Sequence, residues 1–379
     1  MRIALLTRRF DPLGGGTERD LIVTAQCLRD AGHDLTIFAR EVRGQSQNLN
    51  DFKIRRFGGT SFGRTMGLLS FAYGAPKAAR LDGADLIISF ARTIDADVLR
   101  SGGSAHISYL RAARKWRGEL RWRAMRASPY HQAQVFIERR GFTSSKLKAA
   151  IAVSNLVRDD LIREFRLPQN KVVTLYNGVD LERFTPARDD SGRREIRSSI
   201  GIADAAPIVA FVGNGFARKG LRFLIEAWPR VTRGAHLLVV GADRESRQYQ
   251  REAARLAMST RIHFAGQMSN ITRIFQGVDA LAMPSIFEPF GNVGMEAMAS
   301  GLPVMVSAQS GASELLPETM QKFVVQDPCD SIEIAEKLNA LLDTGETLRD
   351  AARAAAERYT WNAYGENLMK IISALPNNR

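Results

Sequence analysis

Short apolar runs alternate with amphipathic stretches along the whole chain. The first half holds such runs at residues 3–7, 34–38, 85–90 and 149–153, and the second half at 208–212, 237–240, 262–264, 280–283 and 304–306. Each run has the length of a buried strand. Runs without alternating polar positions are typical of parallel sheets that are covered on both faces.

Helical patterns lie between these runs. Residues 17–31 place Leu21, Ala25 and Leu28 on one face of a helix. Further helices are expected at 221–228, 246–258, 271–275 and 293–299. Strands that alternate with helices of this length predict an α/β fold of doubly wound parallel sheets.

The chain is long enough for two such domains, because its 379 residues compare with roughly 150 residues per domain. Asn177-Gly178 is a turn signal directly after the first half, and a polar stretch follows at 186–199. We therefore expect an N-terminal doubly wound domain over 1–176, a second over 177–358, and a final helical segment over 359–379. Ligands of open α/β sheets bind beyond the carboxyl ends of the strands, so the loops after strands are the candidates for chemistry.

Composition adds one unusual feature. The chain is 45% hydrophobic and 25% charged, which is ordinary for a globular protein and excludes a disordered one. Its formal net charge is +13, and segment 100–148 holds twelve lysines and arginines against two acids, Glu119 and Glu138. Ten of the thirteen net positive charges therefore lie in this segment, which predicts either a polyanionic partner or a solvated face.

The sequence also predicts a cytoplasmic location. Two cysteines, Cys27 and Cys329, make neither a disulfide framework nor a metal site, which fits a reducing compartment. No apolar run approaches the roughly 18 residues of a transmembrane helix. The apolar stretch at the start of the sequence is too short for a signal peptide.

The first candidate loop contains Gly14-Gly15-Gly16, which follows the first strand and opens the first helix. Glycines let backbone N–H groups approach a ligand closely, and a helix N-terminus favours an anion. A plain tight turn explains the same residues. The dinucleotide-binding pattern is absent, because Arg19 stands where its last glycine would be.

The second candidate loop, 213–220, carries Arg218 and Lys219 at the start of a helix. An arginine grips a phosphate with two parallel hydrogen bonds, and a lysine adds a point charge. The pair predicts a diphosphate site, with a solvated Arg–Lys pair as the alternative. The loop matches neither the dinucleotide pattern nor the Walker phosphate loop.

The third candidate segment, 284–304, contains Glu288 and Glu296. Glu288 is expected in a loop and Glu296 inside the following helix, a little over two turns away, so the two can address different ends of one ligand. Backbone amides at 291–293 would add an anion site at the helix start. The alternative is a loop acid and a partly buried helix acid that share no ligand.

These motifs together resemble the retaining, metal-independent GT-B nucleotide-sugar glycosyltransferases of family 4. The matching features run in order along almost the whole chain: Gly14-Gly15, Tyr176-Asn177-Gly178-Val179-Asp180, Arg218-Lys219-Gly220, Glu288-x7-Glu296 and Gly301-Leu302-Pro303-Val304. The resemblance implies two Rossmann-like domains that face each other across a cleft, and a last helix that crosses back to the N-terminal domain. It implies no cofactor and no metal, although Asp95-x-Asp97 has the form of the metal pair of the other major glycosyltransferase fold.

The resemblance also implies roles for the loop residues. Arg218 and Lys219 would bind the donor diphosphate, Glu296 would hold the ribose hydroxyls, and Glu288 would approach the transferred sugar. The rest of the implied donor site comprises Phe290, Gly291, Asn292 and Val293 at the sugar or its phosphate, Gly266 and Gln267 beside the base, and Gly14 and Gly15 at the phosphate or acceptor. As a departure, Asn214 stands where many relatives carry an additional cation.

A fourth loop is expected at 97–106, after the strand at 85–90. Its Gly102-Gly103-x-x-His106 element resembles that of bacterial lipopolysaccharide-core glucosyltransferases, which implies that His106 lies near the sugar and takes part in catalysis; a lone histidine is otherwise more often structural. The implied reaction moves glucose from UDP-glucose to a lipopolysaccharide inner core or a similar anionic glycolipid, with retention. Transfer of mannose or another hexose to a different lipid or polysaccharide, and nucleotide-sugar binding without turnover, are the alternatives.

The basic segment 109–126 interleaves its cations with Tyr109, Trp116 and Trp122. Such a surface fits an anionic bilayer, the phosphates of an anionic acceptor, or simply a solvated helix face. Nucleic acid is not expected, because no recognised nucleic-acid-binding motif is present. Membrane contact and acceptor binding are compatible, since the acceptor is itself a lipid. We therefore expect a peripheral protein at the inner face of the cytoplasmic membrane.

Overall fold

The computed structural model describes residues 1–11, 16–43, 52–59, 63–202 and 206–376. The chain divides into two compact units. The first unit consists of Met1–Asn177 together with Trp361–Arg379, and the second of Gly178–Thr360. Among the described residues, no helix is long and apolar enough to cross a membrane.

A parallel sheet forms the centre of the first unit. Its strands are β1 (Arg2–Phe10), β2 (Asp34–Val42), β3 (Lys53–Arg56), β4 (Leu86–Ser89), β5 (Val98–Ser101), β6 (Ala149–Ala152) and β7 (Val172–Thr174). They pair in the order β3-β2-β1-β4-β5-β6-β7, every pair parallel. The direction of strand succession reverses between β1 and β4, which makes this the point at which such sheets bind ligands.

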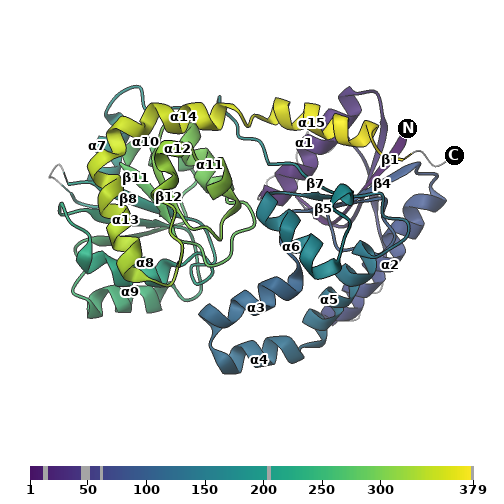
Figure 1. The fold of residues 1–379 in the computed structure, drawn as a ribbon, viewed down its shortest axis with the longest axis horizontal. Coiled ribbons are helices and arrows are strands. Elements are labelled where there is room, and N and C mark those ends of the chain that lie inside the picture. Colours follow the sequence, from purple (N-terminus) through teal and green to yellow (C-terminus); the bar gives the residue numbers. More distant parts are fainter. Residues whose placement is uncertain (12–15, 44–51, 60–62, 203–205, 377–379) are drawn as a thin grey trace. The chain divides into compact units, whose positions relative to one another are not determined.

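Helices cover this sheet, and the C-terminal helix belongs to the same unit. The helices are α1 (Gly16–Asp30), α2 (Gly63–Leu81), α3 (His106–Arg117), α4 (Glu119–Ala127), α5 (Pro129–Phe142), α6 (Asn155–Phe165), the 3-10 helix η2 (Gln169–Lys171) and α15 (Trp361–Ser373). Helix α15, yellow in Figure 1, packs beside α1 although more than 300 residues separate them in sequence.

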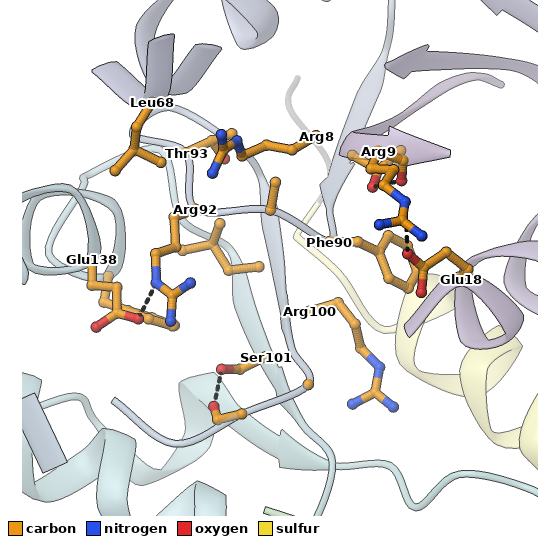
Figure 2. Close-up of a pocket in the computed structure, with 16 residues that line it drawn as sticks. Arg8, Arg9, Glu18, Leu68, Phe90, Arg92, Thr93, Arg100, Ser101 and Glu138 are labelled. Carbon is orange, nitrogen blue, oxygen red and sulfur yellow. Dashed lines mark hydrogen bonds and ion pairs between the residues drawn. The ribbon is translucent and has the colours of Figure 1, made fainter. Parts of the chain in front are cut away.

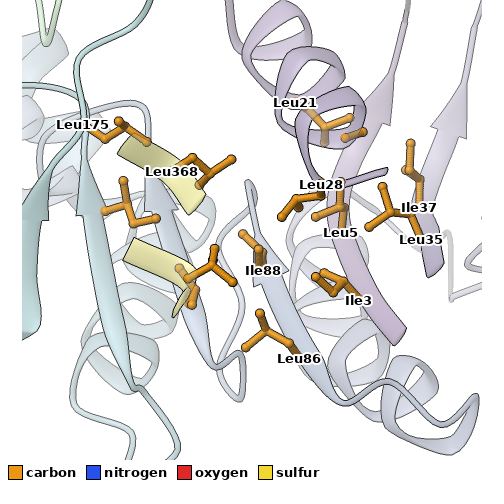
Figure 3. Close-up of a cluster of buried hydrophobic side chains, with 14 of the residues drawn as sticks. Ile3, Leu5, Leu21, Leu28, Leu35, Ile37, Leu86, Ile88, Leu175 and Leu368 are labelled. Carbon is orange, nitrogen blue, oxygen red and sulfur yellow. The ribbon is translucent and has the colours of Figure 1, made fainter. Parts of the chain in front are cut away.

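Aliphatic side chains from both ends of the chain form one core cluster in the first unit (Figure 3). Leu5 of β1 packs there with Leu21 and Leu28 of α1, and Leu368 comes from α15. These leucines are at most 1% exposed. Because burying a leucine contributes about 1.5–3 kcal/mol, the cluster accounts for the attachment of α15 to the first unit.

A buried ionic network lies beside this core and fixes the end of the first unit. Arg100 Nε lies 3.1 Å from Asp20 Oδ2, and Arg100 Nη2 donates to Asn177 Oδ1 at 2.7 Å. The Tyr364 hydroxyl of α15 donates to Asp20 Oδ1 at 2.7 Å and lies 2.7 Å from Thr24 Oγ1. The network therefore joins α1, β5, α15 and the boundary residue Asn177 in one structure.

The second unit is built on a five-stranded parallel sheet. Its strands are β8 (Ile208–Val212), β9 (His236–Val240), β10 (Ile262–Gly266), β11 (Ala280–Met283) and β12 (Val304–Val306), paired in the order β10-β9-β8-β11-β12. Its helices are α7 (Ser191–Ser199), α8 (Leu221–Ala227), η3 (Trp228–Arg230), α9 (Ser246–Arg255), α10 (Ile271–Gly277), α11 (Asn292–Ala299), η4 (Gly311–Leu315), α12 (Glu318–Gln321), α13 (Ser331–Thr344), η5 (Gly345–Leu348) and α14 (Arg349–Glu357). The prediction of doubly wound parallel sheets is confirmed.

One predicted loop is wrong. Residues 97–106 were expected as an irregular segment, but Val98–Ser101 is strand β5, which pairs with both β4 and β6, and His106 begins helix α3. The short run Val98-Leu99 is interrupted by Arg100, which hides the strand in the apolar pattern. Arg100 is nevertheless only 5% exposed, because Asp20 balances its charge and Asn177 accepts a hydrogen bond from its Nη2 inside the protein.

Candidate functional site

Two loops meet at the carboxyl edge of the second unit's sheet. Loop 213–220 leaves β8 and loop 284–291 leaves β11, its neighbour in the sheet. The backbone N–H of Ile286 donates to the carbonyl of Arg218 at 2.9 Å and ties the loops together. Strand succession reverses between β8 and β11, so this is the ligand-binding position of an open α/β sheet.

Two glycines let the first loop pack tightly around Lys219. Gly213 has a φ of +135°, and a Cβ at this position would lie 2.7 Å from Lys219 Cε. Gly220 has a φ of +80°, and its Cβ would lie 2.0 Å from the carbonyl oxygen of Pro284. The lysine stem is thereby enclosed, and its side chain is only 9% exposed. A charge held in this way requires a charged partner.

Glu288 is that partner. Lys219 Nζ donates to Glu288 Oε2 at 2.7 Å, and Arg218 Nη1 lies 3.1 Å from the same oxygen. Arg218 also donates to the carbonyl of Phe287 at 2.6 Å. Burial by itself would raise the pKa of the Glu288 carboxyl, but the charges of Lys219 and Arg218 outweigh it and hold the pKa below its usual range. Two cations and one carboxylate thus leave the cluster with a net positive charge.

The second loop holds Glu288 next to the start of a helix. The carbonyl of Glu288 accepts from the N–H of Gly311 at 3.1 Å. Gly291 has a φ of +96°, a conformation that suits glycine, and α11 begins at the next residue. No side chain caps this helix start, where the backbone carries partial positive charge. An anion placed here would therefore meet two side-chain cations and a helix N-terminus.

The remaining predicted residues of this unit lie at the same sheet edge. Phe290 is buried, and its carbonyl accepts from Ser310 Oγ at 3.1 Å. Asn292 and Val293 form the first turn of α11, and Glu296 is a partly buried residue one turn further along it. The sequence predicted Glu288 in a loop and Glu296 in the following helix, and the structure places both residues there.

A further strand end brings the predicted base-flanking residues to this edge. Gly266 is the last residue of β10, exposed, and its carbonyl accepts from the N–H of Gly241 at 2.7 Å. Gln267 follows it and is exposed. Asn214, the residue that departs from the family pattern, accepts from the N–H of Ala242 at 2.8 Å, so its side chain supports the β9 loop. Gly14 and Gly15 lie outside the described residues.

The first unit has its own cavity, of about 440 Å³, which sequence reasoning missed (Figure 2). It lies where β1, β4 and β5 end, at the reversal point of that sheet. Four arginines and two glutamates are among the residues that line it: Arg8, Arg9, Arg92, Arg100, Glu18 and Glu138. The available signal was Arg8-Arg9, two cations directly after the apolar part of β1.

His106 belongs to a hydrogen-bond network that includes Glu138 of the cavity wall. The residue is 5% exposed, and its Nε2 lies 2.9 Å from His131 Nδ1. Its backbone N–H donates to Glu138 Oε2 at 2.6 Å, and Arg92 Nε donates to Glu138 Oε1 at 2.6 Å. Burial, with the nearby charges of Arg92 and His131, lowers the pKa of His106 to about 3. The ring is therefore uncharged at neutral pH and is suited to hydrogen bonding rather than to proton uptake.

The Asp95-x-Asp97 pair is engaged by cations. Asp95 Oδ2 lies 3.0 Å from Lys146 Nζ. Asp97 is 2% exposed, pairs with Arg80, and accepts from the N–H of Ile87 at 2.8 Å. Among the residues that the structure describes, no group of three or more His, Cys, Asp or Glu side chains is arranged to hold a metal ion.

The basic segment forms the helix pair α3 and α4 (Figure 1). One of its aromatic residues joins the two helices: the indole N–H of Trp122 in α4 donates to the carbonyl of Leu110 in α3 at 2.7 Å. Within α3, Tyr109 packs on Trp116 with ring centres 5.9 Å apart. Helix α4 has no buried residue. Arg117, Arg121 and Arg126 of this segment are exposed, whereas Arg114 and Arg123 pair with Glu119.

Two protein-family models match the chain, one in each half. "Glycosyltransferase Family 4" matches residues 14–183, and "Glycosyl transferases group 1" matches residues 192–358. Among curated proteins, the chain is 28% identical over 229 residues to an uncharacterized glycosyltransferase, MJ1607, of Methanocaldococcus jannaschii, covering 58% of each chain. The chain spans less than two thirds of the length of this and of other curated relatives that it matches.

Other similarities extend over the whole chain. The lipopolysaccharide glucosyltransferase WaaG of Escherichia coli is 22% identical over 363 residues, which are 95% of this chain and 94% of that protein. The crystal structure of WaaG superimposes with a TM-score of 0.78 at 21% identity, over 98% and 100% of the two chains. Anabaena Alr3699/HepE in complex with UDP gives a TM-score of 0.75 at 19% identity, over 99% and 100%. These structures share the fold of two parallel-sheet domains.

Proposed function

Because this chain belongs to the glycosyltransferases of group 1 and family 4, which have the GT-B fold, we propose that it moves a hexose from a nucleotide diphosphate sugar to an acceptor hydroxyl, with retention at the anomeric carbon. The donor we propose is UDP-glucose. The acceptor we propose is a lipopolysaccharide inner core or a similar anionic glycolipid.

The cluster of Arg218, Lys219 and Glu288 is the observation that carries this proposal. It lies at the reversal point of the second unit's sheet, it has a net positive charge, and it adjoins the start of α11. A diphosphate matches these features, because it offers several oxygens to a lysine and a forked guanidinium. In this role Glu288 keeps both cations in place before the donor binds, and then faces the sugar.

The proposed reaction breaks the bond between the anomeric carbon and the diphosphate oxygen. The electron pair stays on the diphosphate, and the acceptor oxygen bonds to the anomeric carbon from the same face of the sugar. The leaving phosphate takes the acceptor's proton, so the proposal requires no protein base. Arg218 and Lys219 stabilise the negative charge that develops on the leaving group, which is the largest contribution in reactions of this type. The proposed chemistry uses these side-chain cations in place of a metal ion.

The names of two similar proteins support the choice of substrates. WaaG, which aligns with 95% of this chain, is a lipopolysaccharide glucosyltransferase. HepE has been solved with UDP and with UDP-glucose. In our proposal Glu296 holds the ribose, Gly266 and Gln267 adjoin the base, and His106 acts as a neutral hydrogen-bonding group on the acceptor side.

We also assign the helix pair α3 and α4 to an anionic membrane surface. Arg117, Arg121 and Arg126 are exposed, and Leu120 beside them is 83% exposed. Exposed cations with an apolar side chain fit the boundary between head groups and acyl chains. A glycolipid acceptor would be presented at such a surface, so the protein would work as a peripheral protein on the cytoplasmic face.

A donor screen tests the proposed function. The purified chain is incubated with a panel of nucleotide sugars in EDTA, with and without deacylated lipopolysaccharide core, and the released nucleotide diphosphate is measured. We expect acceptor-dependent release from UDP-glucose. Release from a GDP-sugar or another UDP-sugar would replace the proposed donor, and donor binding without release from any sugar would favour a binding protein without turnover.

A further inference from the structure

The cavity of the first unit holds polar groups that the protein itself leaves unsatisfied. Thr93 is 1% exposed, and its Oγ1 has no hydrogen-bond partner among the described residues. Arg8 Nε is equally buried and equally without a partner. Both residues line the cavity, and in Figure 2 the Arg8 side chain extends from β1 toward Thr93. Buried polar groups without partners cost free energy, so their position calls for an occupant that accepts hydrogen bonds.

The charged residues of the cavity indicate the charge of the ligand that would accept these hydrogen bonds. Of its arginines, Arg92 is paired with Glu138, Arg100 with Asp20 and Arg9 with Asp11. Arg8 differs, because its partner is the Tyr130 hydroxyl, to which Arg64 also bonds, and the ion pairs of the described residues include no carboxylate for it. Among the described residues, Arg8 therefore has no carboxylate in an ion pair with it, although Glu18 and Glu138 line the same cavity.

We propose that this cavity binds a phosphoryl group on the acceptor, with Arg8 Nε and Thr93 Oγ1 as donors to its oxygens. A phosphate presents several acceptor oxygens at once, which suits an N–H and an O–H that converge from two strand ends. A volume of about 440 Å³ is enough for a sugar ring that carries the group. The assignment of the ligand to the acceptor rests on the proposed function, whereas the binding of an anionic sugar to the cavity does not.

The position of the cavity agrees with this assignment. It lies at the reversal point of the first unit's sheet, as the Arg218, Lys219 and Glu288 cluster does in the second. The second cluster supplies its own carboxylate, whereas Arg8 has none. Glu138 joins the cavity wall to the His106 network through its two oxygens, so Arg92 and Glu138 are positioning residues for the wall.

Binding of small sugars to the full chain tests the proposal. Calorimetric titrations use glucose 6-phosphate, glucuronic acid and glucose as probes, each in the presence of saturating UDP so that the second unit's site is filled. We expect glucose 6-phosphate to bind at least tenfold more tightly than the other two. Glucuronic acid binding as tightly as glucose 6-phosphate would overturn the phosphoryl assignment, and a lack of binding by all three would overturn the site.

Variants locate the binding. Arg8→Gln is expected to weaken glucose 6-phosphate binding by roughly ten- to a hundredfold, because a charge-assisted hydrogen bond is lost. Arg8→Lys keeps the charge but lacks the Nε donor, and it is expected to weaken this binding as well. Thr93→Val is expected to weaken binding, whereas Thr93→Ser restores the hydroxyl and the affinity. Arg55→Gln, which removes an exposed arginine paired with Asp82, is the matched control and leaves binding unchanged.

UDP binding separates this inference from the proposed function. A chain that binds UDP but not glucose 6-phosphate contradicts the cavity assignment and leaves the donor site intact. A chain that binds glucose 6-phosphate at Arg8 but no nucleotide contradicts the proposed function and supports the cavity. Glucose 6-phosphate binding that survives both Arg8→Gln and Thr93→Val would contradict the assignment of these donors.

Discussion

The two units place cationic side chains at the same topological position, where the strand succession of each sheet reverses, but build these clusters differently. In the second unit, Arg218 and Lys219 are adjacent in sequence and are already paired with Glu288. In the first unit, Arg8 and Thr93 come from different strand ends, and two of their atoms, Arg8 Nε and Thr93 Oγ1, have no hydrogen-bond partner among the described residues. The charges of the second unit's cluster are paired without a ligand, whereas the two unpartnered atoms of the first unit's cavity would gain hydrogen-bond partners from one.

This difference has a physical consequence. A lysine as buried as Lys219 would be destabilising without Glu288, so the proposed donor site carries its own counter-ion. Arg8 Nε and Thr93 Oγ1 stay without partners among the described residues, so the anion that we propose for the cavity would stabilise the folded unit. We therefore expect the cluster of the second unit to be preorganised, and the folding stability of the first unit to increase more when its ligand binds.

The first prediction concerns folding stability and tests whether Arg100 has a structural role in the cavity wall, unlike Arg8, for which we propose ligand binding. Asp20→Asn leaves Arg100 buried without its carboxylate partner and is expected to destabilise the first unit by about 3–5 kcal/mol. Asp30→Asn is the control, because Asp30 lies on the same helix with its side chain 71% exposed. Thermal denaturation of the full chain measures both. Equal stability of the two variants would show that Arg100 is not held by this pair.

The next effect concerns turnover at the second site. Lys219→Ala removes one of the two cations proposed to stabilise the leaving group and is expected to lower kcat by about a hundred- to a thousandfold. Arg222→Gln removes a nearby arginine that is exposed and paired with Glu226, and its kcat is expected to match the unmodified chain. Acceptor-dependent UDP release is the readout. Similar rates for both variants would contradict the donor site.

The sequence predicted the cluster of the second unit but not the cavity of the first. Arg218, Lys219 and Glu288 lie in two continuous loops with their own glycines, so the motifs predicted which residues the structure brings together. The cavity of the first unit depends on Arg8 of β1 and on Thr93 and Arg100, which follow much later in the sequence, and no local pattern links Arg8 to the other two. Strand β5 was missed because Arg100 interrupts it, and only the tertiary partner Asp20 explains why an arginine is buried there.

A smaller effect concerns the pH dependence of the first unit. The pKa of His106 is lowered in the folded chain, so the unfolded chain binds its proton first, near its ordinary pKa of about 6.5. Folding stability therefore decreases as the pH falls from about 6.5 toward 3. His106→Asn is expected to make this decrease shallower. The lowered pKa values of His33 and His131 in the same unit, and of His263 in the second unit, act in the same direction. Denaturation midpoints between pH 7 and pH 4.5 test it, and an unchanged slope would contradict the burial argument.

A still smaller effect concerns the exposed arginines of α3 and α4, for which we propose membrane contact. Arg117→Gln is expected to weaken binding to phosphatidylglycerol vesicles by about 1 kcal/mol, with no change in UDP binding. Arg222→Gln, in the second unit, is the matched control. Vesicle sedimentation at two salt concentrations is the measurement, since screening weakens such contacts. Equal binding to phosphatidylcholine vesicles would contradict an electrostatic role for α3 and α4.

Titration of UDP into the full chain in EDTA would show whether the second unit binds the donor nucleotide with its own side chains. We expect the unmodified chain and Arg8→Gln to bind UDP equally, and Lys219→Ala to bind it at least tenfold more weakly. UDP binding that Lys219→Ala leaves unchanged, or that Arg8→Gln abolishes, would contradict the division of the two sites between the two units.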